Sequence, residues 1–343
     1  MQDCKLIRLQ DCKLIRLQDC KLIRLQDCKL IRLQDCKLIR LQDCKLIRLQ
    51  ELLISQSYSL FPYKGDFVMD KKICEICPKH CRLKIGEVGK CRARINDGEK
   101  ITALNYGEIT SIALDPIEKK PLYKFFPGSK ILSVGSYGCN LNCPFCQNFE
   151  ISMADSTFPT RKISPEQLAN LAAELVPQKN IGVAFTYNEP FISYEFVRDT
   201  SEFLKSLGLK SVLVTNGTVA PAALKKILPL IDAMNIDLKG FSQEIYSLLG
   251  GDFKTVQKTI ELAAQVCHVE VTTLIVPTMN DSPDDMDAEA LWLAKISKDI
   301  PLHISRFFPR YKIKNLPPTP VKKIYELVEV AKRHLNFVYA GNC

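Results

Sequence analysis

Apolar and polar positions follow a regular order from about residue 130 onward, where short apolar runs alternate with longer amphipathic segments. The apolar runs are rich in Val, Ile and Leu and predict six β-strands, at residues 131–135, 183–187, 211–215, 233–238, 269–276 and 302–307. The first amphipathic segment opens with Ser164-Pro165-Glu166-Gln167, which combines an N-cap serine, a first-turn proline and a capping-box glutamine. Further helices are expected at about residues 192–207, 221–230, 255–266, 283–296 and 320–335.

Six consecutive β/α units predict an α/β fold with a parallel sheet. Six units are fewer than the eight of a closed barrel, so we expect an incomplete (β/α)6 barrel over residues 123–343. The active site of such a barrel lies at the C-terminal ends of the strands. Residues 69–122 are expected to form a small N-terminal cysteine-rich domain, with a hairpin through residues 101–113.

Residues 2–49 consist of six copies of the octapeptide Gln-Asp-Cys-Lys-Leu-Ile-Arg-Leu. Structural repeats usually run ~20–50 residues, and an octapeptide advances by about 80° per copy on a helix, so no face recurs. As one continuous strand, its two sides both mix apolar and polar residues. We therefore predict that residues 1–50 are not native structure, and that Met69 is the true start. The alternative is a basic tail without a chemical role.

Composition and charge narrow the class of protein. With 46% hydrophobic and 25% charged residues, the 343-residue chain is typical of a globular protein. The repeat holds 12 of the 47 basic and 6 of the 38 acidic residues, so the net charge of +9 falls to only +3 without it. We therefore expect no nucleic-acid partner. Neither a membrane span of ~18–20 apolar residues nor a signal peptide is visible, which favours a cytoplasmic protein without a membrane partner.

Cysteines supply the candidate chemistry. Six of the 15 belong to the repeat, and seven of the other nine fall in two tight clusters. Such clusters are typical of metal ligands in a reducing compartment rather than of a disulfide scaffold.

The second cluster is the CxxxCxxC loop of Cys139, Cys143 and Cys146, which follows the first predicted barrel strand. A four-iron cluster normally takes four thiolates, so three leave one iron open. S-adenosylmethionine can chelate that iron through its amino and carboxylate groups. Reductive cleavage then yields methionine and a 5′-deoxyadenosyl radical. The alternative is a structural zinc site completed by a distant Cys or His.

The CxxxCxxC loop, with the aromatic Phe145 before its last cysteine, resembles the radical SAM superfamily. Further motifs resemble the radical SAM enzyme of the AmmeMemoRadiSam system, a family related to the activating enzymes of pyruvate formate-lyase. They are Asp115-Pro116-Ile117-Glu118-Lys119-Lys120-Pro121-Leu122, Cys146-Gln147-Asn148, Thr186-Tyr187-Asn188-Glu189-Pro190 and Asp237-Leu238-Lys239-Gly240. The resemblance covers about residues 74–341.

The resemblance implies cofactor-binding residues at the strand ends. Asn188 and Glu189 stand where relatives have a Gly-Gly-Glu-Pro turn that receives the methionine amino group, although both glycines are absent here. Asn216, Asp237 and Lys239 stand where relatives bind the ribose and carboxylate of S-adenosylmethionine, and Phe145 adjoins the cluster ligands. A lysine suits a carboxylate and an aspartate suits ribose hydroxyls. The alternative for each is a turn residue or an ion pair. His303, near the end of the sixth strand, is a structural residue or faces the cavity.

The first cluster consists of Cys74, Cys77, Cys81 and Cys91. Four thiolates suit a second metal, either structural zinc or an auxiliary iron–sulfur cluster. Relatives continue past residue 342 into a segment with more cysteines, so we expect that the C-terminus of this chain is truncated.

The leading hypothesis is a radical SAM enzyme that uses a 4Fe–4S cluster and S-adenosylmethionine to abstract hydrogen from an unidentified substrate. Its expected partners are a one-electron donor such as flavodoxin or ferredoxin and the other AmmeMemoRadiSam proteins. The first alternative is an activase that installs a glycyl radical on a partner protein. The second is a zinc or iron–sulfur module without enzymatic activity.

Overall fold

The computed structural model of the chain describes residues 71–343 and, within the repeat, six short strands. The chain divides into two compact units, Met1–Phe67 and Val68–Cys343. Met69, the predicted start, lies outside the described residues.

The repeat strands are β1 (Ile7–Leu9), β2 (Ile15–Gln18), β3 (Ile23–Gln26), β4 (Ile31–Gln34), β5 (Ile39–Gln42) and β6 (Ile47–Leu49). They form two parallel sheets, β1-β3-β5 and β2-β4-β6, in which identical residues pair, as Ile7 does with Ile23. The whole octapeptide predicts no strand with a consistent apolar side. The strands occupy only three or four residues of each copy, within which apolar and polar residues alternate. That the tract is not native stays a prediction.

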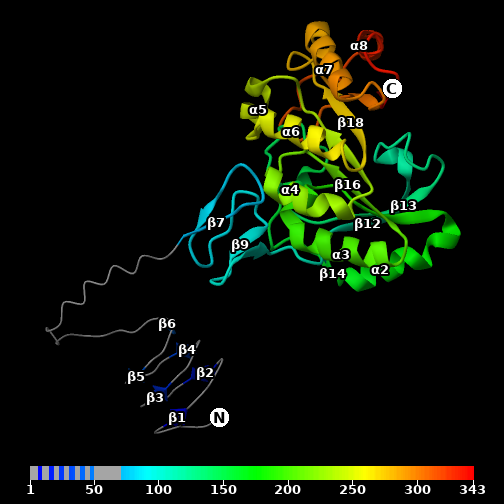
Figure 1. Cartoon of the computed structure of the whole chain (residues 1–343). Helices are drawn as coiled ribbons and strands as arrows, with labels where there is room; N and C mark the ends of the chain where they lie inside the picture. Colours follow the sequence, from blue (N-terminus) through cyan, green and yellow to red (C-terminus); the bar gives the residue numbers. More distant parts are fainter. Residues whose placement is uncertain are drawn as a thin grey trace. The chain divides into compact units, whose positions relative to one another are not determined.

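An eight-stranded sheet organises the second unit (Figure 1). Its order is β12-β13-β15-β16-β17-β18-β19-β20, with β12 antiparallel to β13 and the other neighbours parallel. The strands are β12 (Ser111–Pro116), β13 (Lys130–Gly135), β15 (Asn180–Phe185), β16 (Lys210–Thr215), β17 (Ala233–Asp237), β18 (His268–Ile275), β19 (Leu302–Arg306) and β20 (Val338–Gly341). Because β12 and β20 are edges that do not pair with each other, the barrel is open, as predicted.

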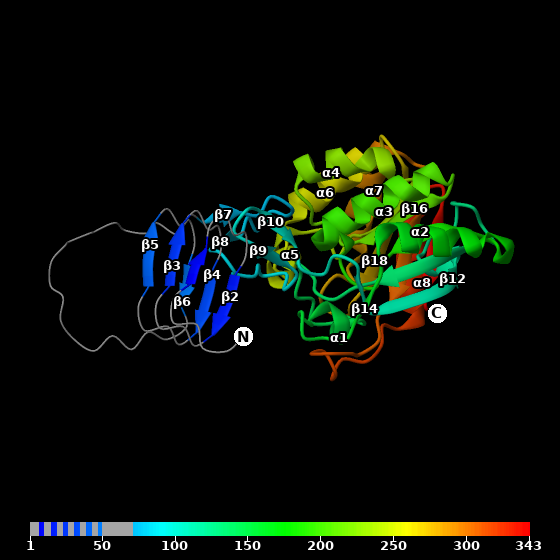
Figure 2. The same ribbon diagram turned by 90° about the horizontal axis from the view of Figure 1, so that it is seen from below.

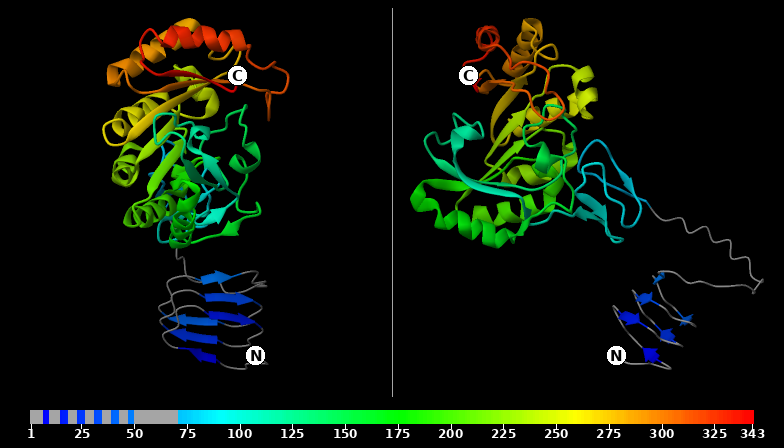
Figure 3. Two further views of the ribbon diagram at one scale, coloured as in Figure 1. Left: turned by 90° about the vertical axis from the view of Figure 1, so that its right-hand side faces the viewer. Right: turned by 180° about the vertical axis from the view of Figure 1, so that it is seen from behind.

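Helices cover the outer side of this curved sheet (Figures 2 and 3). They are α2 (Pro165–Glu174), α3 (Tyr194–Ser206), α4 (Pro221–Ile227), α6 (Phe253–Ala263), α7 (Pro283–Ile296) and α8 (Val321–Ala331). Two short helices, α1 (Phe149–Ser152) and α5 (Gln243–Leu249), follow β13 and β17. The main hydrophobic core lies between these helices and the sheet and includes Leu132, Leu168, Met234 and Leu293. The predicted capping box is present, since Ser164 and Gln167 each accept a hydrogen bond from the other's backbone N–H.

The inner side of the sheet is filled at its amino-terminal end by the segment that follows β12. Ile117, Leu122 and Phe125 from this segment pack against Ile131 and Val212 in a second core. This packing closes the barrel floor and leaves the carboxyl ends of the strands for a site.

All six predicted parallel strands are present, and β20 is a seventh that the sequence analysis did not predict. One prediction about the elements requires correction. The hairpin expected through residues 101–113 is wrong: β10 (Ile101–Ala103) pairs instead with β9 (Arg94–Asn96), and β12 joins the barrel sheet. The 122/123 domain boundary stays a prediction, although β12 lies before it.

The cysteine-rich region consists of short pairs, β7 (Lys72–Ile73) with β8 (Arg82–Leu83) and β9 with β10, while β11 (Glu108–Ile109) pairs with β14 (Arg161–Lys162). Within the described residues, no helix has the length and apolarity that crossing a membrane requires.

Candidate active site

The CxxxCxxC loop occupies the turn between β13 and α1, at the carboxyl end of the first parallel strand. Gly138 has a φ of +85°, in the region that glycine alone adopts readily. A Cβ there would also lie 2.6 Å from the carbonyl oxygen of Cys91. The loop therefore needs glycine immediately before its first cysteine.

Neighbouring strand ends hold the loop in place. Asn140 donates to the carbonyl oxygen of Thr218 at 2.7 Å, and the Asn216 amide donates to Asn140 Oδ1 at 2.9 Å. Phe145 is buried in a small apolar cluster with Leu141 and Cys143. Its aromatic ring is thus part of the packing beneath the cysteines.

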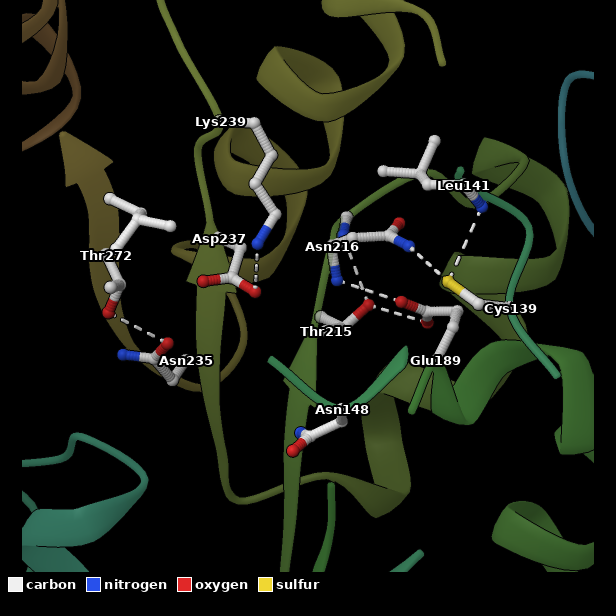
Figure 4. A network of polar contacts seen from close by, with 12 residues as sticks. Cys139, Leu141, Asn148, Glu189, Thr215, Asn216, Asn235, Asp237, Lys239 and Thr272 are labelled. Carbon is white, nitrogen blue, oxygen red and sulfur yellow. Dashed lines mark hydrogen bonds and ion pairs between the residues drawn. The ribbon is translucent and has the colours of Figure 1, made fainter. Parts of the chain in front are cut away.

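Two N–H groups point at the sulfur of Cys139. The Leu141 backbone N lies 3.4 Å and the Asn216 Nδ2 3.6 Å from Sγ (Figure 4). Burial raises the pKa values of Cys139 and Cys143, so the free thiols are protonated at neutral pH. Hydrogen-bond donors to sulfur favour a thiolate ligand and help to set the reduction potential of an iron–sulfur cluster. Three thiols with these donors are a ligand set that suits a 4Fe–4S cluster, and their role as its ligands stays a prediction.

The Thr186–Pro190 turn supports the same loop from the end of β15. Asn188 donates to the Gly138 carbonyl at 3.0 Å and accepts from the Ser136 N–H at 3.0 Å. Tyr187 has a φ of +70°, which is strained for an aromatic residue. A left-handed backbone, which glycine adopts most readily, is thus adopted here by a tyrosine.

Glu189 connects β15 to β16. Its carboxylate accepts from the backbone N–H groups of Phe191 and Asn216, at 3.0 and 2.8 Å, and from the Thr215 hydroxyl at 2.7 Å. Burial raises its pKa to about 7, although these three donors oppose the shift. With three bonds inside the protein, Glu189 mainly fixes the strand end that carries Asn216.

Asp237 and Lys239 form an ion pair at the end of β17, with Lys239 Nζ 2.7 Å from Asp237 Oδ2. Burial lowers the pKa of Lys239, but the Asp237 carboxylate outweighs burial and keeps the ammonium charged. The pair offers a carboxylate and an ammonium side by side.

One cavity of about 250 Å³ adjoins the cysteine loop. Its lining includes the three loop cysteines and every predicted cofactor-binding residue: Cys139, Cys143, Phe145, Cys146, Asn188, Glu189, Asn216, Asp237 and Lys239. Figure 4 shows the polar groups arriving from successive strand ends. The structure thus brings together residues that lie up to a hundred positions apart in the sequence.

The cavity also has a wall that sequence reasoning missed, composed of Thr272, Leu274, Ser305 and Asn342 from β18, β19 and the end of β20. Tyr187, Asn148 and Ser152 line it as well. Asn148 and Tyr187 lie within the motifs Cys146-Gln147-Asn148 and Thr186–Pro190, so the sequence could have identified them. Thr272 and Ser305 carry only the weak signal of polar residues within apolar strands.

A larger cavity of about 680 Å³ lies between α6 and α7 and contains Cys267, His268 and Trp292. None of the predicted site residues borders it. His303 also lies away from the site, because its Nε2 contacts the buried Glu270 Oε2 at 2.6 Å.

The first cysteine cluster lies in two adjacent turns. Cys74, Cys77 and Cys91 are buried and Cys81 is partly exposed. Burial, together with the three neighbouring cysteines of the cluster, raises the pKa of Cys77 to about 11. Within residues 71–343, no three His, Cys, Asp or Glu side chains are arranged as a preformed metal site. The metal at this cluster stays a prediction.

Comparisons with known proteins agree with this geometry. Residues 133–290 match the model of the radical SAM superfamily. An uncharacterized protein of Methanocaldococcus jannaschii is 39% identical over 278 residues, 80% of this chain and 82% of that protein.

One curated relative and one solved structure are more distant from this chain. The pyruvate formate-lyase 1-activating enzyme of Escherichia coli is 27% identical over 157 residues, and the match spans 43% of this chain and 61% of that enzyme. The crystal structure of Streptococcus suis SuiB bound to the precursor peptide SuiA shares the fold, with a TM-score of 0.50 and 14% identity over 66% of this chain and 51% of SuiB. On the cysteine loop, the sheet and these matches, the chain belongs to the radical SAM superfamily.

Proposed function

We propose that Cys139, Cys143 and Cys146 hold the catalytic 4Fe–4S cluster, and that the adjoining cavity binds S-adenosylmethionine and substrate. As a radical SAM enzyme, the protein uses both cofactors; when bound, they supply a 5′-deoxyadenosyl radical that abstracts hydrogen from the substrate. One observation carries the assignment to these residues. The three cysteines border the same cavity of about 250 Å³ as Asp237, Lys239 and Asn216.

Each neighbouring residue has a distinct role in this proposal. The Lys239 ammonium binds the carboxylate of S-adenosylmethionine, and Asp237 accepts hydrogen bonds from its ribose hydroxyls. Asn216 donates to Cys139 Sγ. Asn188 and Glu189 hold the cysteine loop and the Asn216 backbone, respectively. Phe145 packs below the cluster ligands.

The test is anaerobic reconstitution with iron and sulfide, followed by dithionite and S-adenosylmethionine. The protein should gain a four-iron cluster and form 5′-deoxyadenosine. The variant with Cys139, Cys143 and Cys146 changed to Ala should form none, whereas the control Cys267→Ser should match the parent. Equal product from the triple variant would refute the assignment.

We also infer which proteins work with this enzyme. It acts with the other proteins of an AmmeMemoRadiSam system and receives its electron from a flavodoxin or ferredoxin in the cytoplasm. The motifs Asp115–Leu122 and Thr186–Pro190 support this assignment. Reconstituted enzyme is incubated with cell extract and deuterated candidate substrates. Deuterium should appear in 5′-deoxyadenosine when the deuterated compound is the true hydrogen donor.

The second candidate function is activation of a glycyl-radical enzyme, which the match to pyruvate formate-lyase 1-activating enzyme favours. This function predicts that the hydrogen donor is a protein. A stable organic radical, detected by electron paramagnetic resonance on a partner polypeptide, would support it. Deuterium transfer from a small metabolite would favour the first function instead.

A further inference from the structure

Arg92 connects the two cysteine clusters. It follows Cys91 directly in the chain, and its guanidinium reaches the catalytic loop. One nitrogen, Nη2, lies 3.1 Å from the carbonyl oxygen of Cys139 and 3.0 Å from that of Ser152 at the end of α1. The side chain therefore holds both ends of the segment that contains Cys139, Cys143 and Cys146.

The backbone of the first cluster contacts the same segment. The carbonyl oxygen of Cys91 packs against Gly138, where a Cβ would lie only 2.6 Å away. Cys91 and Ala93 also share a small apolar core with Tyr137. The turn that presents Cys91 thus lies directly against the residues that precede Cys139.

Arg92 is held in an unfavourable conformation for this role. Its φ is +67°, in the left-handed region that non-glycine residues seldom adopt. Its buried Nε has no hydrogen-bond partner, which costs free energy. Among the described residues it makes no salt bridge, and the carboxylate of Asp155, whose pKa it helps to lower, is near but not in contact. Strain and an unsatisfied donor persist where the surrounding structure imposes them.

We propose that Arg92 is a positioning residue through which the N-terminal cysteine cluster fixes the catalytic loop and makes its cluster easier to reduce. This proposal rests on the proposed function. Holding the Cys139 carbonyl keeps Sγ within reach of the Leu141 and Asn216 donors. Hydrogen bonds to sulfur and nearby positive charge both stabilise the reduced form of an iron–sulfur cluster.

The test compares the midpoint potential of the catalytic cluster in wild type, Arg92→Gln and Arg92→Lys. At a fixed potential, Arg92→Gln should lower the ratio of reduced to oxidised cluster about tenfold, or about 59 mV for one electron. Arg92→Lys retains the charge and should recover part of the shift. The control Arg198→Gln removes a surface charge that pairs with Asp199 and should match wild type.

The link to the first cluster needs a separate variant. Cys91→Ser should shift the potential in the same direction, and Cys91→Ser with Arg92→Gln should shift it by less than the sum of the two. Potentials are measured on the iron-loaded fraction, so reduced loading does not affect the reading. A wild type that binds no cluster would refute the proposed function. Two results would overturn this inference, provided that wild type binds the cluster. In the first, Arg92→Gln has the same potential as wild type and the same electron paramagnetic resonance spectrum after addition of S-adenosylmethionine. In the second, Cys91→Ser has an unchanged potential.

Discussion

The carboxylate of Glu189 accepts the backbone N–H of Asn216 at 2.8 Å and thereby joins the carboxyl ends of β15 and β16. The residue is only 2% exposed, and groups of the protein donate all three of its hydrogen bonds. The position of Asn216, and of its amide beside Cys139, depends on this contact.

The first prediction follows from that contact. Glu189→Ala leaves three buried donors without an acceptor and should destabilise the fold by about 3 kcal/mol or more. It should also weaken binding of S-adenosylmethionine, because Asn216 is no longer held. Chemical denaturation and equilibrium binding measure the two effects. Glu202→Ala, a surface change, is the control, and unchanged stability in Glu189→Ala would show that the three bonds contribute little.

Local signals in the sequence explain what was predictable. Ser164 and Gln167 identify a helix start because both partners lie within one turn. The spacing of Cys139, Cys143 and Cys146 indicates a three-ligand loop without knowledge of the fold. Conversely, α5 was missed although Ser242 accepts from the Ile245 N–H as its N-cap and Gly250 ends it with a φ of +73°.

What was missed depends on contacts between distant segments. β12 reads locally as part of a hairpin, but Ser111–Pro116 pairs with residues 130–135 instead. β20 has only four residues, and its strand state comes from pairing with β19. The cavity wall of Thr272, Ser305 and Asn342 exists only once those strands are adjacent, so residue type alone could not identify it.

The second prediction concerns Glu289, which lies on α7 and is 2% exposed. Burial raises its pKa from 4.5 to about 8, although the Thr273 hydroxyl donates to it. The folded state therefore binds a proton that the unfolded state has lost, and stability falls as pH rises from about 4.5 to 8. Glu289→Gln removes this penalty and retains an acceptor for Thr273.

We expect Glu289→Gln to be more stable than wild type at pH 8, by roughly 2–4 kcal/mol, and to approach wild type near pH 4.5. Urea denaturation of both proteins across this pH range measures the difference between their free energies of unfolding. The titrations of all other groups cancel in that difference. Parallel stability curves would mean that Glu289 does not titrate in this window.

The third prediction concerns the first cysteine cluster. A small cysteine-rich region has little core of its own and is expected to rely on a metal. Changing Cys77 and Cys81 to Ser should remove that metal and lower the melting temperature, while the Cys139 loop still assembles its cluster. Metal analysis of this variant beside the Cys139/Cys143/Cys146 variant separates the two sites. If the latter retained neither zinc nor iron, the first cluster would not be an independent site.

The last prediction concerns Glu270, a carboxylate on β18 that is fully buried (0% exposed). It accepts from the backbone N–H groups of Tyr123 and Lys124, at 2.9 and 2.7 Å, and contacts the Nε2 atoms of His268 and His303, at 2.9 and 2.6 Å. It thus binds the segment that closes the barrel floor.

Burial alone would raise the pKa of Glu270, but its hydrogen bonds outweigh burial and lower the pKa from 4.5 to about 2. The stabilisation that ionised Glu270 gives the folded state is therefore complete above pH 4.5 and is lost as pH falls towards 2. This pH dependence is opposite in sign to that of Glu289. Glu270→Gln places an amide N–H₂ among donors and should cost roughly 2–3 kcal/mol at pH 7. The cost should shrink because unfolded wild type takes up a proton on this carboxyl below about pH 4.5, so denaturation at pH 7 and pH 3 should give a smaller difference at pH 3. An equal difference at both values would show that packing, rather than the charge of Glu270, holds the floor segment in the barrel.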